Sequence, residues 1–496
     1  MTATPEWNFS GRLVERLGPC SSLLDAATGR AIGPEELPRL IAAYGASLIS
    51  AGLKKGDRVL IGSTLSTSSA LVYLGAIYAG LVAAPVEDRA VTASAATLLE
   101  ATGAKAVWAE TGLRGGGTLH RSILCLQGDL ARELPGALPP PAVCETSDVA
   151  ALMATSGSTG APRFVTVTHG NLTANTEAII RSQHLASDDK AMVILPVSYV
   201  FGASLLHTHL YGGGSVVFDR RFMFPDKVLQ SIAQFGCTTF AGVPTVYNVL
   251  LRRSNIRRIA MPSLRRFLQA GGGLAPAKID EMRAAFPLTK FYVMYGQTEA
   301  TARISCMDPD RWQDKPGSVG RPLDNLTVSI ADEQGNALRP GQVGNLLVKG
   351  PSICAGYWND PEETRRVFCD GWLRTGDLAR QDEEGYLWIE GRKGSFLKMR
   401  GTRVSLTEVE ERVAAIPGVY ECGACAVDHP EAGEALVLFI VPDRGASIVT
   451  EELHRRLPAN WTLDSIRLVS ELPKTSAGKI ARSALLPLVR DFHAAI

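Results

Sequence analysis

Short apolar segments alternate with stretches of helical periodicity through the first half of the chain. Between the strand candidates 57–62 (DRVLIG) and 104–110 (AKAVWAE), Leu71, Leu74 and Ile77 recur at the spacing of one helix face. The same strand-like composition returns at 193–198, 215–219 and 238–244. Strands separated by helices pair in parallel, because the chain must return to the same edge before it starts the next strand. The alternation predicts an α/β fold built on largely parallel sheets.

The rest of the chain changes character, which predicts further folding units. Segments 327–338, 343–350 and 385–391 have the pattern of short strands joined by turns, and they indicate a β-rich subdomain. Residues from Ser395 onward form a smaller unit with both α and β patterns. The 496 residues also exceed the roughly 250–300 that one hydrophobic core organises. We therefore expect a large N-terminal α/β domain with a β-rich subdomain, followed by a small α+β C-terminal domain.

Charge and apolar patterning argue against two classes of partner. The formal net charge is +1 and the chain has no basic block, which argues against nucleic acid. The most apolar uncharged stretch, 59–86, opens with polar residues and is interrupted by Gly75, Gly80 and Pro85. Because a spanning helix needs about 20 mostly apolar residues, this stretch predicts a buried strand and helix and no membrane span.

The cysteines indicate a reducing compartment. Nine are scattered along the chain, and the only CxxC pair is Cys422 with Cys425. No second pair or histidine follows at zinc-binding spacing, so both are expected to be apolar residues of a strand. The number of cysteines is odd, and their spacing is not that of a disulfide-bonded protein. The N-terminus also lacks the basic region and the apolar region of a signal peptide. These features predict a cytoplasmic location.

One loop concentrates hydroxyl groups and glycines directly after the apolar segment 151–154. It consists of Thr155, Ser156, Gly157, Ser158, Thr159 and Gly160. Glycines let backbone N–H groups face one concave side, and hydroxyl groups add donors, so the loop suits a chain of phosphates. The Walker pattern GxxxxGK[ST] does not fit, because Pro162 and Val165 stand where its second glycine would be. From composition alone, an ordinary serine- and glycine-rich turn remains the alternative.

Six ordered motifs carry a specific resemblance. They are TSGSTGAPR…THGNL (155–172), AGGGL (270–274), MYGQTEA (294–300), GWLRTGDLA (371–379), GRKGSFLKMRGTRVSLTEVE (391–410) and LPKTSAGKIAR (472–482). Together they resemble the adenylate-forming superfamily: acyl-CoA synthetases, adenylation domains of nonribosomal peptide synthetases, and firefly luciferase. The resemblance covers essentially the whole chain. It implies an enzyme that uses ATP to convert a carboxylic acid to an acyl-AMP, releases pyrophosphate, and transfers the acyl group to a nucleophile.

The resemblance also implies roles at the ATP site. Residues 155–160 would grip the β- and γ-phosphates, Thr298 would donate to the α-phosphate, and Glu299 would hold Mg²⁺, a cation that prefers carboxylate and phosphate oxygens. Lys479 would bridge the carboxylate and the α-phosphate in the transition state. Tyr295 would stack on adenine. The other ATP- or AMP-binding residues that the motifs imply are Gly271, Gly272, Gly273, Gly296, Gln297, Asp377 and Arg392, with Asp377 at the ribose hydroxyl groups.

A moving C-terminal domain follows from the same resemblance. It implies an adenylation domain over 1–392, a hinge at 393–394 and a mobile domain over 395–496 that carries Lys479 to and from the site. The pivot position, usually Asp or Lys in the family, is Gly394. Glycine provides the φ/ψ freedom that a hinge uses.

The acid pocket is expected around segment 196–204. By resemblance, its candidate residues are Tyr199, Phe201, Gly242, Val243, Gln297 and Arg303. Amino-acid-activating relatives usually place an aspartate near this segment to pair the α-ammonium of the substrate, and no aspartate stands between Leu195 and Leu206. Because an unpaired buried ammonium is costly, the sequence favours a carboxylic acid without an amino group.

The phosphate loop departs from the family pattern Pro-Lys-Gly. This chain has Pro162, Arg163 and Phe164. Arg163 keeps the positive charge in a forked rather than point geometry, and Phe164 adds bulk where glycine is usual.

The acceptor of the acyl group is the least determined feature. Segment 398–410 resembles the CoA-ligase version of its motif, which implies CoA as co-substrate, with Lys398, Gly401 and Arg403 near the incoming thiol. An amine or a carrier-protein thiol remains the alternative acceptor, because the first half-reaction is shared. A non-catalytic nucleotide-binding protein is a more remote alternative, and the sequence gives no oligomeric state.

Overall fold

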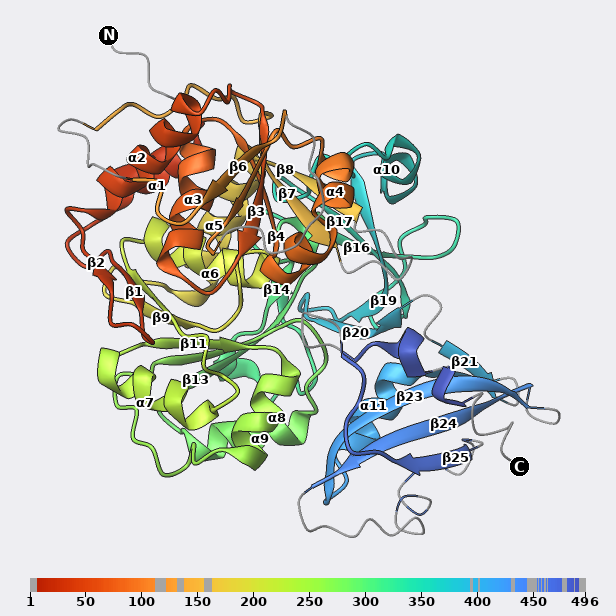
Figure 1. Ribbon diagram of the computed structural model, residues 1–496. Helices are drawn as coiled ribbons and strands as arrows, with labels where there is room; N and C mark the ends of the chain where they lie inside the picture. The colour runs from red at the N-terminus through yellow and green to blue at the C-terminus, as the bar shows by residue number, and fades with distance from the viewer. Residues whose placement is uncertain are drawn as a thin grey trace.

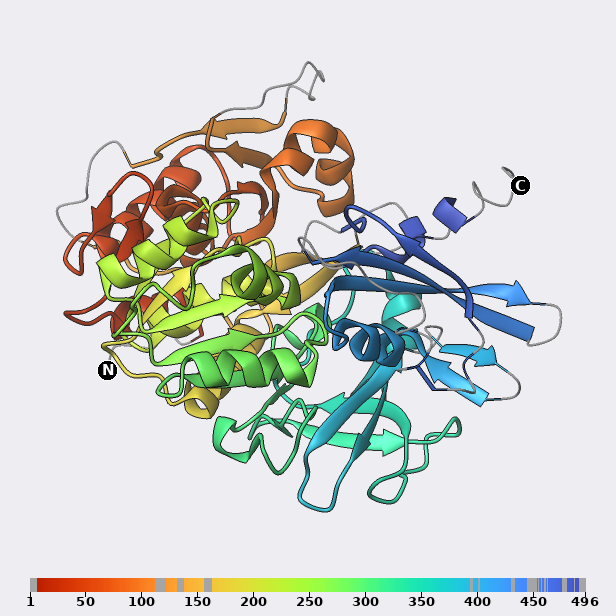
Figure 2. The same cartoon turned by 90° about the horizontal axis from the view of Figure 1, so that it is seen from below.

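The computed structural model describes residues 7–111, 122–131, 138–155, 163–392, 396–399, 402–429 and 433–443, and most of 453–489. The chain has a large N-terminal domain and a small C-terminal domain (Figure 1). Figure 2 shows the C-terminal domain, in blue, lying to one side of the larger one. The predicted boundary at 393–394 lies outside the described residues.

A six-stranded sheet begins the N-terminal domain. Its order is β6 (Leu124–Gln127), β5 (Ala106–Ala109), β3 (Arg58–Ser63), β4 (Val82–Glu87), β7 (Val149–Thr155), β8 (Arg163–Thr168). All neighbours pair in parallel except β7 with β8. The uncharged stretch 59–86 supplies β3, the wholly buried helix α3 (Thr67–Tyr78) and β4. The prediction of a buried strand and helix is therefore confirmed.

A second, nine-stranded sheet carries the strand ends on which the site is built. Its order is β15 (Arg321–Pro322), β14 (Ser305–Cys306), β13 (Lys290–Tyr295), β12 (Arg266–Gln269), β11 (Thr239–Gly242), β9 (Lys190–Val193), β10 (Ser215–Phe218), β1 (Leu23–Asp25), β2 (Ala31–Ile32). The prediction of a strand at 193–198 is wrong in position, since the strand of this region, β9, spans Lys190–Val193. Pro196 has no N–H to donate to a neighbouring strand. The chain then turns tightly into the next helix, because a Cβ at Gly202 would lie 2.4 Å from the carbonyl oxygen of Leu195.

Helices cover both sheets. α5 (His169–Gln183) and the wholly buried α6 (Val200–Tyr211) lie between the two sheets in Figure 1. A reciprocal cap starts α5, in which Thr168 and Asn171 each bond the other's backbone N–H. The remaining helices of this domain are α1 (Phe9–Arg16), α2 (Leu37–Ser50), α4 (Asp88–Thr102), α7 (Pro225–Phe235), α8 (Pro244–Arg253), α9 (Pro276–Ala285) and α10 (Pro361–Val367). Among the described residues, no helix combines the length and apolar character needed to cross a bilayer.

The β-rich subdomain and the C-terminal domain complete the chain. The former is an antiparallel sheet of β16 (Thr327–Ala331), β17 (Gly344–Lys349), β19 (Trp372–Gln381), β18 (Phe368–Cys369) and β20 (Leu387–Arg392), as predicted. The latter comprises β21 (Phe396–Met399), β22 (Thr402–Ser405), α11 (Leu406–Ala414), β23 (Val419–His429), β24 (Gly433–Pro442) and β25 (Leu463–Leu468). Cys422 and Cys425 are buried on β23, which confirms their placement on a strand.

The two domains meet through polar contacts. The Lys278 ammonium on α9 donates to the carbonyl oxygen of Tyr420 at 3.1 Å and to Oδ1 of Asn248 at 2.8 Å. Burial lowers the pKa of Lys278 to about 8. The Arg253 guanidinium lies 4.3 Å from the centre of the Tyr420 ring. This contact therefore depends on charged groups that stay hydrogen-bonded as they lose water.

Glu411 of α11 faces the turn after β12. A Cβ at Gly273 would lie 2.2 Å from Oε1 of Glu411, so the absent side chain makes room for this carboxyl group. Burial, together with the negative charges of Glu410, Glu390 and Glu408, raises the pKa of Glu411 to about 7. The folded chain therefore holds this proton up to a higher pH than the unfolded chain does.

Replacement Glu411→Gln is expected to flatten the pH dependence of stability between pH 5 and 8. The wild-type chain loses stability as pH rises from the ordinary carboxyl range towards about 7, since the unfolded state releases the proton first. The melting temperature at several pH values measures the effect. Glu383→Gln, at an exposed glutamate beyond the end of β19, serves as control. An unchanged slope in Glu411→Gln would show that this carboxyl group does not titrate as described.

Candidate active site

Three neighbouring parallel strands end at one edge of the nine-stranded sheet. β11, β12 and β13 pair in register, and their carboxyl ends lead directly into Val243, the turn Gly271–Gly273 and the segment Gly296–Ala300. Ligands of α/β sheets bind in the crevice at such an edge. The sheet topology thus brings two of the six sequence motifs together with the acid-pocket candidate Val243.

Asp377 joins this edge to the β-rich subdomain. Its carboxylate is 6% exposed and accepts a hydrogen bond from the hydroxyl group of Tyr295, at the end of β13. Arg392, paired with Asp377 across β19 and β20, places its Nε 3.1 Å from Oδ1. Burial and the Asp377 charge raise the pKa of Tyr295, while the Asp377 charge raises that of Arg392. Tyrosine, aspartate and arginine therefore form one cluster, as their motifs predicted they would.

Glu299 lies on the short 3₁₀ turn Thr298–Ala300 beyond the same strand end. One carboxylate oxygen accepts a hydrogen bond of 2.8 Å from the Tyr357 hydroxyl group, and its backbone carbonyl accepts from the Cys354 N–H at 3.0 Å. Burial and the Glu299 charge raise the pKa of Tyr357. Sequence reasoning missed Tyr357, because no motif contains it and its strand-free segment gives no periodic signal.

Arg163 pairs with two acidic residues at the start of α10. Its Nη1 lies 2.8 Å from Glu363 and its Nε 3.6 Å from Asp360, and the guanidinium lies 5.2 Å from the centre of the Tyr357 ring. Phe164 is 2% exposed and packs in the core between the six-stranded sheet and α4. The departure from the family's Pro-Lys-Gly thus has a structural explanation, since both residues are engaged by neighbouring elements.

Three of the expected acid-pocket residues cluster at the start of α6. The rings of Tyr199 and Phe201 meet edge to face at 6.4 Å, and the Arg303 guanidinium lies 4.9 Å from the centre of the Phe201 ring. Gly242 and Val243 lie at the end of β11. Gln297 precedes the 3₁₀ turn, and its buried Nε2 has no hydrogen-bond partner among the described residues.

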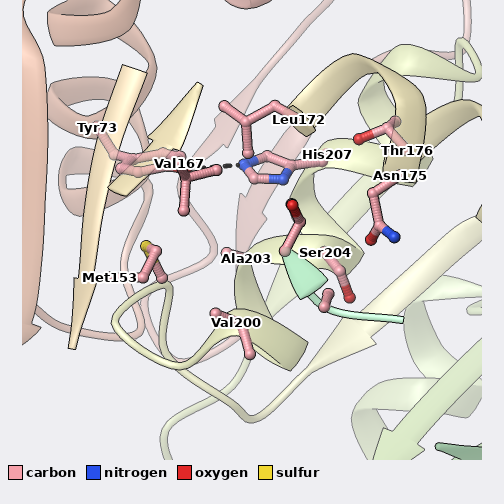
Figure 3. A pocket seen from close by; sticks show the side chains of 12 residues that line it. Tyr73, Met153, Val167, Leu172, Asn175, Thr176, Val200, Ala203, Ser204 and His207 are labelled. Atoms are coloured by element: carbon pink, nitrogen blue, oxygen red, sulfur yellow. Dashed lines mark hydrogen bonds between the residues drawn. The ribbon is translucent and has the colours of Figure 1, made fainter. Parts of the chain in front are cut away.

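A small cavity lies against the opposite face of α6 (Figure 3). Its lining includes Met153, Val167, Val200 and Ser204, and His207 accepts or donates a 3.1 Å hydrogen bond with the Tyr73 hydroxyl group. Burial lowers the pKa of His207 to about 3, so the imidazole is neutral. The cavity is lined by both apolar and polar side chains, and the polar ones include Asn175, Thr176, Ser204 and Thr301 as well as the hydrogen-bonded His207 and Tyr73.

Several predicted residues lie outside the described part of the chain. These are Ser156, Gly157, Ser158, Thr159, Gly160, Gly394, Gly401 and Lys479. For Lys398 and Arg403 only the backbone is described, and the two are paired across β21 and β22. The ends of the lysine loop are placed: Lys474 and Ile480 form a β-bridge, and the Lys474 ammonium lies 3.0 Å from Glu421. Thr155 and Arg163, which flank the other loop, pair across β7 and β8.

Comparisons with known proteins point the same way. The sequence model of the AMP-binding enzyme family matches residues 26–358, and that of the AMP-binding enzyme C-terminal domain matches residues 408–479. The feruloyl-CoA synthase of Amycolatopsis sp is 33% identical over 469 residues, covering 92% of this chain and 93% of that protein. ATP-bound MatB from Rhodopseudomonas palustris superposes with a TM-score of 0.87 at 27% identity, over 98% and 99% of the chains. The amide bond synthetase McbA from Marinactinospora thermotolerans has a TM-score of 0.82 at 25% identity, over 97% and 99%.

Replacement Asp377→Asn is expected to weaken ATP binding about 10- to 100-fold, because it removes the charge on which Tyr295 and Arg392 converge. Calorimetric titration with ATP measures the change. Asp382→Asn is the matched control, since it also removes a carboxylate paired with a cation, Lys315 at 2.7 Å, but lies beyond the end of the same strand. Equal ATP affinity in Asp377→Asn and Asp382→Asn would show that the cluster around Asp377 does not bind the nucleotide.

Proposed function

The chain belongs to the AMP-binding enzyme family of adenylate-forming ligases, and we propose that it joins a carboxylic acid without an α-amino group to AMP and then transfers the acyl group to CoA. The cluster of Asp377, Tyr295 and Arg392 beside Glu299 carries the proposal. It sets a nucleoside-binding end and a metal-binding end side by side at one strand edge. The two ends match the two halves of an ATP molecule.

At the nucleoside end, Asp377 accepts from the ribose hydroxyl groups. Arg392 adds a donor, and Tyr295 lies against adenine with the glycines 271–273 on its other side. The side-chain hydrogen bonds from Tyr295 and Arg392 hold the Asp377 carboxylate in place before ATP arrives, and preorganised charge costs no reorganisation during the reaction. These side chains bind and orient the nucleotide.

At the metal end, Glu299 fits a hard cation. One of its carboxylate oxygens is fixed by Tyr357, and the other makes no hydrogen bond to a described residue. Mg²⁺ prefers such oxygens, and it would neutralise phosphate charge during attack by the carboxylate. Thr298, next in the chain, would donate its hydroxyl group to the α-phosphate. The loop 155–160 would hold the β- and γ-phosphates, and Lys479 would donate to the reacting oxygens.

The charge around the expected acid pocket supports a substrate without an α-ammonium. Arg303 places a buried cation over the Phe201 ring, and no described carboxylate makes an ion pair with it. A substrate ammonium in the same low-dielectric space would meet repulsion rather than pairing.

CoA is the proposed acceptor because the segment from Lys398 to Glu410 has the CoA-ligase form of its motif. Gly401 and Arg403, with Lys398, would then lie near the thiol. An amine is the second candidate, since an amide bond synthetase shares the fold over nearly the whole chain. The choice between them rests on the acceptor experiment below.

We expect acid-dependent release of pyrophosphate when the purified chain receives ATP, Mg²⁺ and a panel of carboxylic acids. CoA should then increase the release of AMP, and an amine panel should not. Chelation of the metal should stop pyrophosphate release. The proposal is wrong if no acid supports pyrophosphate release, which would favour a nucleotide-binding protein without catalysis. Acceleration by amines alone would assign the amide reaction.

The two half-reactions should separate in two variants. Lys479→Ala is expected to slow acyl-AMP formation about 10²- to 10³-fold, because one positioned transition-state donor is lost. Gly394→Pro should leave acyl-AMP formation intact and block transfer to CoA, since proline removes the torsional freedom of the pivot. Rapid-quench measurement of each half-reaction tests both. An equal loss of both half-reactions in Gly394→Pro would contradict a pivot at this residue.

A further inference from the structure

Arg303 is a buried cation fixed at its backbone. Its side chain is among the largest fully buried ones, and the residue is 2% exposed. The Asn175 side chain bonds both its N–H, at 3.3 Å, and its carbonyl oxygen, at 2.9 Å. The guanidinium lies 4.9 Å from the centre of the Phe201 ring, at the start of α6. The position of this charge is therefore set by two helices, α5 and α6.

The guanidinium lacks the anion that a buried charge requires. No described residue makes an ion pair with it or accepts a hydrogen bond from it, and its Nε is fully buried without a partner. Arg266, a buried arginine in the same domain, shows the usual arrangement: its Nη1 lies 2.6 Å from the Asp189 carboxylate. Burial without a counter-ion lowers the pKa of Arg303 to about 10, so the group still carries its charge at neutral pH. Such an arrangement is costly unless a ligand supplies the negative charge.

The same segment holds a second unpartnered donor. The buried Nε2 of Gln297 has no hydrogen-bond partner among the described residues. Gln297 lies six residues before Arg303 in the chain. This segment folds back on itself: the Ile304 N–H donates to the Tyr295 carbonyl oxygen at 2.9 Å, and a Cβ at Gly296 would lie 1.9 Å from the Ala302 carbonyl oxygen. Arg303 is thereby kept beside the strand end that also carries Thr298 and Glu299.

We propose that Arg303 binds a second anionic group of the acid substrate, so that the enzyme activates one carboxyl group of a dicarboxylic, sulfo-carboxylic or phosphono-carboxylic acid. The forked guanidinium donates hydrogen bonds to two oxygens of a carboxylate, sulfonate or phosphonate at once. Gln297 offers a further donor to the same substrate, and Phe201 forms an apolar wall beneath the guanidinium. This inference rests on the proposed function, because it names the substrate class of that acid pocket.

The test compares acids in pairs that differ only in the second anion. Each pair contains a dicarboxylic acid and its monomethyl ester, or a sulfo-carboxylic acid and the acid with a methylsulfonyl group in place of the sulfonate. Chain lengths from three to eight carbons and one aromatic pair are included. Acid-dependent pyrophosphate release gives kcat and KM for each member, with the wild-type chain and with Arg303→Met, Arg303→Lys and Arg16→Met.

The wild-type chain is expected to favour the dianionic member of at least one pair about 100-fold or more in kcat/KM, because a buried charge that loses its partner costs that much. Arg303→Met should abolish this preference, mainly by raising the KM of the dianionic member, so that the two members of each pair differ by less than about fivefold in kcat/KM. Arg303→Lys should restore part of it. Arg16→Met removes an arginine stacked at 4.4 Å on Tyr211, at the other end of α6, and should change neither member.

Two results would overturn the inference. One is a wild-type chain that prefers the singly charged member of every pair. The other is an equal loss for both members in Arg303→Met, which would make Arg303 a structural residue. In either case, pyrophosphate release with a singly charged acid would still support the proposed function. No release with any acid would contradict both the proposed function and this inference. Circular dichroism shows whether Arg303→Met folds. If it does not, the inference is tested by the kcat/KM preference of the wild-type chain for the dianionic acids and by the same preference in Arg303→Lys.

Discussion

The carboxylate of Asp377 is the point on which the site depends. It lies on β19 of the subdomain, yet its partners come from the end of β13 in the nine-stranded sheet and from β20, the last described strand before the C-terminal domain. A single buried charge thus ties the nine-stranded sheet to the β-rich subdomain. Because its hydrogen bonds form in a partly dry environment, they are stronger and more directional than the same bonds in water.

Elsewhere in the described chain, buried charges are mostly neutralised by the protein itself. Asp219 pairs with Arg221 at 2.8 Å, and Asp189 pairs with Arg266. The site departs from this rule at Glu299, which uses one oxygen, and at Gln297 and Arg303, whose buried donors have no described partner. Unmatched polar groups cost stability when they are buried. At Glu299 a cation, and at Gln297 and Arg303 an anion, would complete these groups.

The contact between the domains has a different character from the core. It includes Lys278, Arg253 and Glu411 against backbone oxygen, an aromatic ring and a glycine turn. The ion pair of Arg252 with Asp443 at 3.6 Å and the apolar side chain of Val249 also contribute. Burial shifts the pKa values of Lys278 and Glu411 towards neutrality. Polar interfaces of this kind are typical of domains that change their relative position. The proposed movement of the C-terminal domain between the half-reactions requires an interface that forms and breaks readily. The polar groups of this interface are suited to that movement.

The sequence alone determined the α/β class, the β-rich subdomain, the strand placement of Cys422 and Cys425 and the buried nature of stretch 59–86, because each follows from a local pattern of apolar residues. Its motifs also predicted that Tyr295, Asp377 and Arg392 belong to one site. The tertiary structure decided which side chains meet. Tyr295 and Asp377 are 82 positions apart, and Tyr357 and Glu299 are 58 apart. Such contacts depend on sheet order and register, which no local pattern encodes. For the same reason, only the folded chain shows that Arg303 is buried without a described counter-ion, since a missing partner cannot be recognised until every neighbour is in place.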